Sequence, residues 1–239
     1  MSFDNREGTR VPNAPLQFIE DGKLVTRSSD ELFRGRKVIV FGLPGAFTPT
    51  CSTAHVPRYE QLHDTFADLG VDDIVCVSVN DAFVMDAWRK DENAEHVTFA
   101  ADGNGDFTDG LGLLVEKRDL GFGARSWRYS MLVDDGKIVK QFIEPEKPGD
   151  PYEVSDADTM LGYLAPDREA PHDILLLTKP GCSHCARAKG ALREKNLAFE
   201  EVTATTAMLR AVSDDPRTPR VFVDGKLIGG ADELIAWLS

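Results

Sequence analysis

Apolar runs and helical patterns alternate along the first two thirds of the chain. Short runs rich in β-branched residues, closed by Gly, Pro or polar residues, predict buried strands. Segments with apolar residues at every third or fourth position predict helices. We therefore expect strands at residues 37–45, 72–80 and 96–102, helices at 53–70 and 81–92, and a hairpin at 129–144 around an Asp-Gly turn. This alternation predicts an α/β layered domain.

A second and shorter alternation begins at residue 173. The hairpin within it is predicted from the dipeptide Asp224-Gly225, which separates two apolar runs. The predicted elements are a strand at 173–178, a helix at 182–196, a strand at 197–203, a helix at 204–213, the hairpin at 220–230 and a final helix at 231–239. The order β-α-β-α-β-β-α predicts a second, smaller α/β domain.

Two segments rich in proline and charged residues, 144–158 and 165–173, separate these patterns. Such composition is typical of loops and linkers. We expect one domain at 1–165, a linker at 166–172 and a second domain at 173–239. The charge agrees with this division, because residues up to 170 carry 18 basic and 31 acidic side chains, whereas the remaining chain carries 9 of each.

The net charge of the 239-residue chain is −13, which limits the classes of partner. An acidic surface repels phosphate backbones and anionic lipid heads, so we expect neither nucleic-acid nor membrane partners. No apolar run approaches the roughly 18–20 residues of a membrane span. The polar first 15 residues lack the apolar core of a secretory signal, so we expect a cytoplasmic protein.

Four cysteines stand at positions 51, 76, 182 and 185. In a reducing compartment, catalytic or metal-binding thiols are expected more often than structural disulfides. Cys76 lies in the middle of a predicted strand, where a buried thiol packs as a small apolar residue. A resolving role for Cys76 is the alternative.

Cys182 and Cys185 enclose Ser183-His184 directly after a strand and at the start of a predicted helix. The free N–H groups and partial positive charge of a helix N-terminus stabilise a thiolate at Cys182, and Lys179 adds a positive charge. Cys185 lies one turn further on, within reach of a disulfide. A zinc site is the alternative, but one cysteine pair supplies too few of the usual four ligands, so we expect no metal.

The stretches TKPGCSHC (178–185) and RTPRVFVDGKLIGGADEL (217–234) resemble glutaredoxin, over nearly all of residues 171–239. The resemblance implies that the peptide bond before Pro219 is cis and lies beside Cys182. It implies that Asp232 receives the ammonium group of glutathione and that Lys179 and Arg217 offer charge to its glycyl end. Ser183-His184 replaces the more common Pro-Tyr, which leaves the redox potential open. The implied glutathione-binding residues are Lys179, Cys182, Thr218, Pro219, Gly230, Ala231 and Asp232.

Pro44, Thr48 and Cys51 form an ordered set at the end of one predicted strand and the start of the next helix. Cys51 falls in the first helical turn, where the helix N-terminus favours its thiolate. Pro44 shields the site and restricts the backbone. A single cysteine near a helix start is a weak signal, whereas this spacing of three residue types is far more specific.

The stretches FGLPGAFTPTCSTAHVP, CVSVNDAFVMDAW and WRYSMLVDDGKI resemble the peroxiredoxins, in particular the peroxiredoxin-five class, over about residues 5–163. The resemblance implies that Cys51 is the nucleophile that attacks peroxide, that Thr48 orients the peroxide and that Arg128 borders the thiolate. The alternative for Arg128 is an ordinary surface ion pair. His55 is expected to be a hydrogen-bonded helix residue rather than a catalytic base.

The whole chain resembles the bacterial hybrids of peroxiredoxin and glutaredoxin, which implies two thioredoxin-fold domains. The segment 144–160 lacks the resolving cysteine that some relatives carry there, so oxidised Cys51 needs an external thiol. The implied function is reduction of H2O2 and alkyl hydroperoxides, with glutathione as co-substrate and Cys182, helped by Cys185, as the recycling thiol. We expect a homo-oligomer, a dimer or tetramer, without a permanently bound cofactor. The alternatives are a peroxide sensor and a non-enzymatic holdase.

Overall fold

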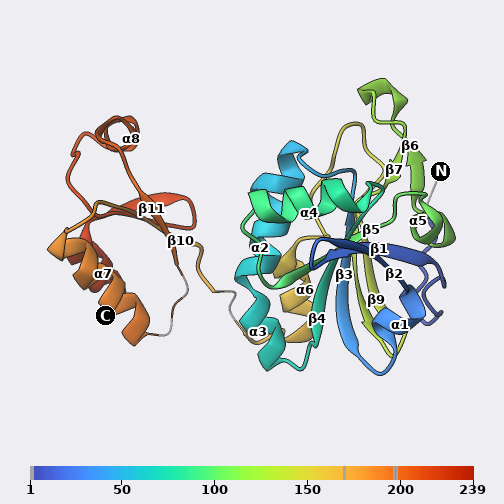
Figure 1. Ribbon diagram of the computed structural model, residues 1–239. Coiled ribbons are helices and arrows are strands. Elements are labelled where there is room, and N and C mark those ends of the chain that lie inside the picture. The colour runs from blue at the N-terminus through green and yellow to red at the C-terminus, as the bar shows by residue number, and fades with distance from the viewer. Residues whose placement is uncertain (1–2, 169–170, 196, 198) are drawn as a thin grey trace. The chain divides into compact units, whose positions relative to one another are not determined.

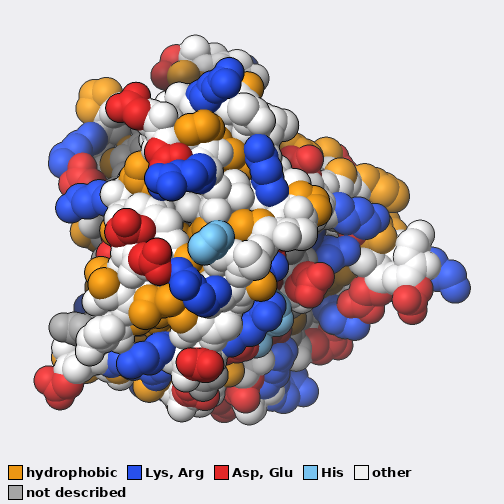
Figure 2. Space-filling model, turned by 90° about the vertical axis from the view of Figure 1, so that its left-hand side faces the viewer, with side chains coloured by type: hydrophobic (Ala, Val, Ile, Leu, Met, Phe, Trp, Pro, Cys, Tyr) orange, Lys and Arg blue, Asp and Glu red, His pale blue; other side chains and the backbone are white. Residues whose placement is uncertain are grey.

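The computed structural model describes residues 3–168, 171–195, 197 and 199–239. The chain forms two compact units, Met1–Glu169 and Ala170–Ser239 (Figure 1). The division falls within the segment expected to be a linker. Basic and acidic side chains are interspersed over the face drawn in Figure 2.

A seven-stranded sheet forms the centre of the first unit, in the order β2-β1-β5-β4-β3-β8-β9. Strands β3, β4 and β5 are parallel, and antiparallel hairpins flank them on both sides (Figure 1). The strands are β1 (Pro15–Glu20), β2 (Lys23–Ser28), β3 (Lys37–Leu43), β4 (Asp73–Ser78), β5 (Val97–Ala101), β8 (Tyr129–Asp134) and β9 (Lys137–Ile143). Strands β6 (Leu114–Glu116) and β7 (Ala124–Ser126) form a separate pair.

Both faces of this sheet are buried, because alternate residues of its central strands contribute to two different cores. Ile39 and Phe41 of β3 belong to one core, and Val38 and Val40 to the other. The first core includes residues of η1 (Cys51–His55), α2 (Val56–Gln61), α4 (Ala82–Asp91) and α6 (Ala157–Leu164), and Phe66 of α3 (His63–Asp68). The second includes residues of α1 (Ser29–Phe33) and α5 (Asp106–Gly110).

The helix predicted at 53–70 is not continuous, which corrects the prediction. A π-helical turn, η1, begins at Cys51, and the N–H of Val56 bonds to the Cys51 carbonyl five residues earlier. Pro57 follows in the first turn of α2 and has no N–H to offer, so the regular four-residue bonding fails just before it. A second break at Leu62, with φ −89° and ψ 4°, separates α2 from α3.

The other long elements follow their predictions closely. Helix α4 begins after Asp81, whose carboxylate caps it by accepting from the N–H groups of Phe83 and Val84. The β8–β9 turn at Asp135-Gly136 has both residues at positive φ, as a tight hairpin requires. The hairpin β1–β2 was not predicted, although Asp21-Gly22 at positive φ carries the same signal. The short elements α1, α5, β6, β7 and the 3₁₀ turn η2 (Arg118–Leu120) were also not predicted.

The second unit has a four-stranded sheet in the order β11-β10-β12-β13, with β10 and β11 parallel. Its element order is the β-α-β-α-β-β-α predicted from the sequence. The elements are β10 (Ile174–Thr178), α7 (Ser183–Glu194), β11 (Glu200–Thr203), α8 (Thr206–Val212), β12 (Arg220–Val223), β13 (Lys226–Gly229) and α9 (Ala231–Trp237). The α/β prediction is confirmed for both units.

Candidate active sites

Cys51 lies at the point where the chain leaves β3 and begins η1, and its side chain is fully buried. The hydroxyl of Thr48 lies 2.9 Å from the Cys51 sulfur and 2.9 Å from the carbonyl oxygen of Gly45. A hydroxyl has one proton to donate, so Thr48 donates either to the sulfur or to the carbonyl. The oxygen therefore keeps accepting capacity for a hydroxylated ligand beside the thiol.

Arg128 lies 77 residues from Cys51 in the sequence, and the pairing of β3 with β8 brings it close to Cys51. The antiparallel register pairs Gly42 with Tyr129, so Arg128 lies at the carboxyl end of β3. Its Nη2 donates to the Cys51 sulfur at 3.4 Å, and the side chain is 1% exposed. This burial rules out the alternative of an ordinary surface pair.

The charge of Arg128 is maintained despite its burial. Burial alone would lower the pKa of the guanidinium, but the neighbouring Cys51 and the Asp150 carboxylate together raise that pKa above its usual value. A permanent positive charge therefore lies against the Cys51 sulfur, where it stabilises a thiolate.

His55 completes this cluster as a neutral ring. Its Nδ1 lies 3.0 Å from Arg128 Nη1, and its Nε2 lies 3.1 Å from the carbonyl oxygen of Ser155. Arginine only donates and a carbonyl only accepts, so Nδ1 is unprotonated and Nε2 carries the proton. Burial, and then the charge of Arg128, hold the pKa of His55 well below its usual value. His55 is thus a hydrogen-bonded helix residue, as expected.

Pro44 and Cys76 are buried near this cluster, in different settings. Pro44 directly follows β3 and begins the loop to Cys51. Cys76 lies in β4, paired with Phe41 of β3, and it carries a free thiol. Burial, and then the proximity of Cys51, raise the pKa of the Cys76 thiol. This setting agrees with a packing role and disfavours a resolving one, which requires a reactive thiolate.

Cys182 stands at the N-cap of α7, and its sulfur accepts the N–H of Cys185 at 3.1 Å. The two cysteines are joined in a disulfide, with their Cα atoms 5.2 Å apart. Thr218 Oγ1 donates to the Cys182 sulfur at 3.4 Å, and the Thr218-Pro219 peptide bond is cis, as predicted. Cys182 is partly exposed, whereas Cys185 is buried.

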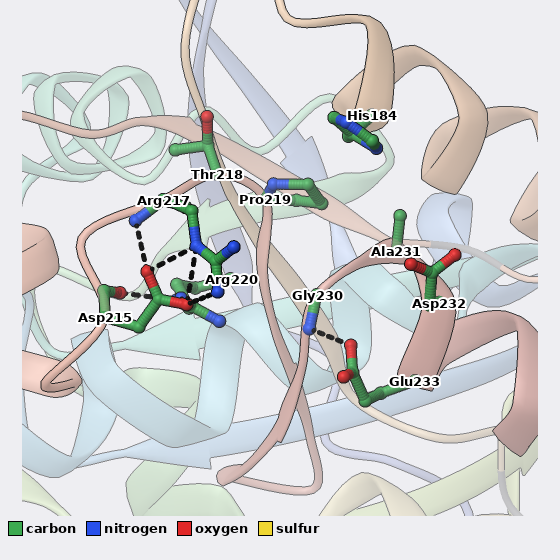
Figure 3. A pocket seen from close by; sticks show the side chains of 10 residues that line it. All are labelled: His184, Asp215, Arg217, Thr218, Pro219, Arg220, Gly230, Ala231, Asp232 and Glu233. Atoms are coloured by element: carbon green, nitrogen blue, oxygen red, sulfur yellow. Dashed lines mark hydrogen bonds and ion pairs between the residues drawn. The ribbon is translucent and has the colours of Figure 1, made fainter.

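A pocket between α7, β12 and the start of α9 gathers most of the predicted glutathione-binding residues (Figure 3). Its walls include Thr218, Pro219, Gly230, Ala231 and Asp232. Lys179 and Cys182 instead line a second hollow beside β11, and Lys179 Nζ donates to Thr206 Oγ1 at 3.2 Å.

The charged groups of this pocket are already paired, and the sequence alone did not suggest these partners. Asp215 binds Arg217 at 2.6 Å and also pairs with Arg220 (Figure 3). Hydrogen bonds from these two arginines hold the pKa of Asp215 well below its usual range. Asp232 pairs with Arg187 of α7.

Two family models match the chain. Residues 6–161 match the Redoxin family and residues 174–228 match the Glutaredoxin family. The chain therefore belongs to the peroxiredoxin-type peroxidases and carries a fused glutaredoxin domain. Both domains thus have the thioredoxin fold that the resemblance implied.

One curated relative aligns with this chain over nearly the full length of both proteins. The chain is 55% identical over 236 residues to the hybrid peroxiredoxin hyPrx5 of Haemophilus influenzae, covering 97% of this chain and 98% of that protein. The predicted resemblance to the hybrid family is confirmed.

Solved structures of peroxiredoxins match about two thirds of the chain. Reduced Prx3 of Vibrio vulnificus in complex with H2O2 is 45% identical, with a TM-score of 0.63, over 66% of this chain and 98% of that one. The 1-Cys peroxiredoxin of Plasmodium falciparum is 32% identical, with a TM-score of 0.66, over 68% of this chain and 100% of that one.

Among residues 3–168, 171–195, 197 and 199–239, no group of three or more His, Cys, Asp or Glu side chains is arranged to hold a metal ion. Within the same described residues, no helix is long and apolar enough to cross a membrane.

Proposed function

We propose that this peroxidase reduces H2O2 and alkyl hydroperoxides through Cys51 and is recycled by glutathione and by Cys182 of the glutaredoxin domain. The observation that carries the peroxide step is the buried Cys51 sulfur, which has the Thr48 hydroxyl at 2.9 Å and the Arg128 guanidinium at 3.4 Å. The H2O2 bound in the Vibrio vulnificus Prx3 structure supports the choice of substrate.

In the first step the Cys51 thiolate attacks one peroxide oxygen, and the O–O bond breaks. The sulfur becomes a sulfenic acid, and the departing oxygen takes a proton and leaves as water or an alcohol. Arg128 stabilises the negative charge that develops on the two oxygens. Thr48 accepts a hydrogen bond from the peroxide and so holds it in line with the sulfur. Pro44 limits the backbone around the thiol.

In the second step glutathione attacks the sulfenic acid, and water leaves as a mixed disulfide forms on Cys51. The Cys182 thiolate then attacks the glutathione sulfur and releases the Cys51 thiol. Cys182 then carries the glutathione as a mixed disulfide. A second glutathione attacks the glutathione sulfur and frees the Cys182 thiol, with glutathione disulfide as the product. Alternatively, Cys185 attacks Cys182 and releases glutathione, and two further glutathione molecules reduce the resulting Cys182–Cys185 disulfide to two thiols and glutathione disulfide. This order is supported because the only other cysteine, Cys76, is buried with a raised pKa.

The pocket of Figure 3 supports the choice of glutathione as the ligand of Cys182. In this proposal the exposed Asp232 carboxylate exchanges Arg187 for the ammonium of the tripeptide. Arg217 and Lys179 take the glycyl carboxylate, and the backbone at Gly230 and Ala231 lies along the ligand beside Thr218 and Pro219. A reducing compartment, the cytoplasm, and a homo-oligomer are part of the same proposal.

The test is peroxide consumption with glutathione, glutathione reductase and NADPH as the only reducing system. The parent protein should turn over many times, Cys51→Ser should be inactive, and Cys76→Ser should match the parent as a cysteine-for-serine control. A single stoichiometric oxidation without turnover would contradict the proposal and favour a peroxide sensor. Turnover with another thiol reductant but not with glutathione would contradict the glutathione assignment.

A further inference from the structure

The segment 145–155, which links β9 to α6, lies against the peroxide site of the first unit. Within this segment, Asp150 contributes both carboxylate oxygens to Arg128. Its Oδ1 lies 3.2 Å from Arg128 Nε, and its Oδ2 pairs with Nη2, the same nitrogen that donates to the Cys51 sulfur. A bidentate pair of this kind fixes the plane of a guanidinium as well as its position.

Two more groups close around the same guanidinium. The centroid of the Tyr152 ring lies 5.6 Å from the guanidinium carbon of Arg128. The same centroid lies 5.0 Å from the centroid of the His55 ring. His55 accepts from Arg128 Nη1 and donates from Nε2 to the carbonyl oxygen of Ser155. Arg128 is therefore held by a histidine from η1 and by a carboxylate and a ring from the segment 145–155.

The segment itself is fixed from the end of β9. The buried carboxylate of Glu144 accepts the N–H groups of Glu153, Val154 and Ser155 at 2.8–2.9 Å, and the Ser155 hydroxyl at 2.7 Å. Lys117 Nζ donates to the carbonyl oxygen of Gly149 at 3.3 Å, one residue before Asp150. These anchors determine where Asp150 lies, although the segment contains neither helix nor strand.

We propose that Asp150 is a positioning residue, which holds Arg128 so that Nη2 remains directed at the Cys51 sulfur and at the peroxide. Its carboxylate has two opposing effects on the reaction. It orients the guanidinium, which favours the transition state, and it offsets part of the positive charge, which disfavours the thiolate. Asp150 is 29% exposed, so water screens its charge while the geometry is kept, and we expect orientation to dominate.

Asp150→Ala and Asp150→Asn separate the two effects, since asparagine keeps an oxygen that accepts from Nε but lacks the charge. Glu146→Gln removes an equal charge from an exposed side chain of the same segment and serves as the matched control. All variants are made in full-length protein with Cys182 and Cys185 replaced by serine. The rate of a single oxidation of Cys51 by H2O2 is then measured from low to high pH, without glutathione.

On the high-pH plateau, where the thiolate is fully formed, we expect Asp150→Ala to react roughly tenfold more slowly than its parent and Asp150→Asn roughly threefold more slowly. Glu146→Gln should match the parent. The pH at half-plateau should stay the same or fall in both Asp150 variants, because a negative charge has been removed. If Asp150 acted only through its negative charge, both Asp150 variants would instead react faster than the parent, because the charge that opposes the thiolate would be gone.

Plateau rates of Asp150→Ala at or above those of the parent would overturn the proposal. So would a defect that disappears completely at high pH, because the carboxylate would then act only on the ionisation of Cys51. The proposal rests on the peroxide step of the proposed function and not on glutathione. If the parent reacts with H2O2 but does not turn over with glutathione, only the recycling scheme is contradicted. The rates of Cys51 oxidation in the Asp150 variants still test the positioning role.

Discussion

The Arg128 guanidinium has three hydrogen-bond partners in the peroxide site, and each of them uses a different property of the group. The positive charge of the guanidinium lies against the Cys51 sulfur, and one of its N–H groups donates to His55. The Asp150 carboxylate accepts from two nitrogens and so fixes the plane of the guanidinium. Thr48 reaches the same sulfur through a neutral hydroxyl. The site therefore offers one charged and one uncharged hydrogen-bond donor, and the contributions of the two are separable by mutation.

We expect Arg128→Ala to slow peroxide reduction by about 10²–10³-fold at neutral pH, with only part of the loss recovered at high pH. The recovered part reflects thiolate formation, and the remaining part reflects charge stabilisation of O–O cleavage. Thr48→Val should instead give a loss of about tenfold or more that persists at every pH, because it removes a hydrogen bond and no charge. Rapid-mixing rates across a pH series provide the measurement. Full recovery of Arg128→Ala at high pH would exclude a role for Arg128 in O–O cleavage.

We expect the neutral, buried His55 to make the stability of the first unit sensitive to acid. Burial holds the pKa of His55 well below its unfolded value of about 6.5, so below that pH only the unfolded state takes up the proton. Stability attributable to His55 is complete above a pH of about 6.5 and falls by up to about 1.4 kcal/mol per pH unit on acidification, until the folded pKa is reached. His55→Gln, which can accept from Arg128 and donate to Ser155, should remove this dependence.

The measurement is urea unfolding between about pH 5 and pH 7.5, on either side of the unfolded pKa, followed by tryptophan fluorescence in a Trp237→Phe background. Trp88 and Trp127, both in the first unit, then supply the signal. An identical pH slope for the parent and for His55→Gln would show that His55 does not carry the effect.

At the scale of elements, the contact between β3 and β8 brings Arg128 to Cys51. Gly42 of β3 faces Tyr129 of β8, and a Cβ at Gly42 would overlap the Tyr129 ring. The absence of a side chain at Gly42 thus allows the buried Tyr129 ring to cover the strand, directly after Arg128 in the sequence.

Gly42→Ala should destabilise the first unit by about 1–3 kcal/mol, because the added methyl group forces the ring or the strand to move. Gly162→Ala is the control, since this glycine lies in α6 and an added Cβ would meet nothing within 4 Å, so alanine there should be neutral or stabilising by up to about 1 kcal/mol. Urea unfolding measures both. Equal stabilities of the two variants would contradict the role assigned to Gly42.

The helical segment that begins at Cys51 is interrupted twice, by the π-helical turn η1 and by the break at Leu62. The π-helical turn Cys51–His55 widens the helix directly after Cys51, and the His55 ring at its end bonds to Arg128. Pro57, which has no N–H to donate, follows this turn by two residues, and both the proline and the cysteine lie within one short stretch of sequence.

For the whole molecule, the proposed cycle requires both domains, and each cysteine of the second domain has a different role. Cys182→Ser should abolish glutathione-supported turnover while leaving the first oxidation of Cys51 intact. Cys185→Ser should reduce turnover only a few-fold, because free glutathione replaces the buried second thiol. Steady-state NADPH consumption and single-turnover oxidation measure the two steps separately. If Cys185→Ser were as severe as Cys182→Ser, the dithiol route would be obligatory.

The fusion has a kinetic consequence for the proposed cycle. A linker that lets Cys182 reach a Cys51 mixed disulfide holds it there at an effective concentration on the order of mM, above what a separate protein reaches in dilute solution. An acidic first domain and a neutral second domain, joined by the proline-containing segment 166–172, agree with two modules that fold independently.

The sequence by itself determined the features that depend on short stretches of chain. Asp-Gly dipeptides predicted two of the hairpins, and Asp81 marked the start of α4. The position of Cys182 and Cys185 directly after a predicted strand placed them at a helix start. These features follow from local backbone preferences and capping, which require no distant partner. The ordered set Pro44, Thr48 and Cys51 is local for the same reason.

Only the tertiary structure decided which distant charges meet. Asp150 lies 22 residues from Arg128 and His55 lies 73 residues from it, and no local pattern in the sequence pairs them. Short elements such as α1 and α5 also depend on the sheet they cover, since five residues are too few to form a stable helix alone. The physical reason is that burial and long-range hydrogen bonds fix these groups only after the strands have paired, so their partners are a property of the packed molecule.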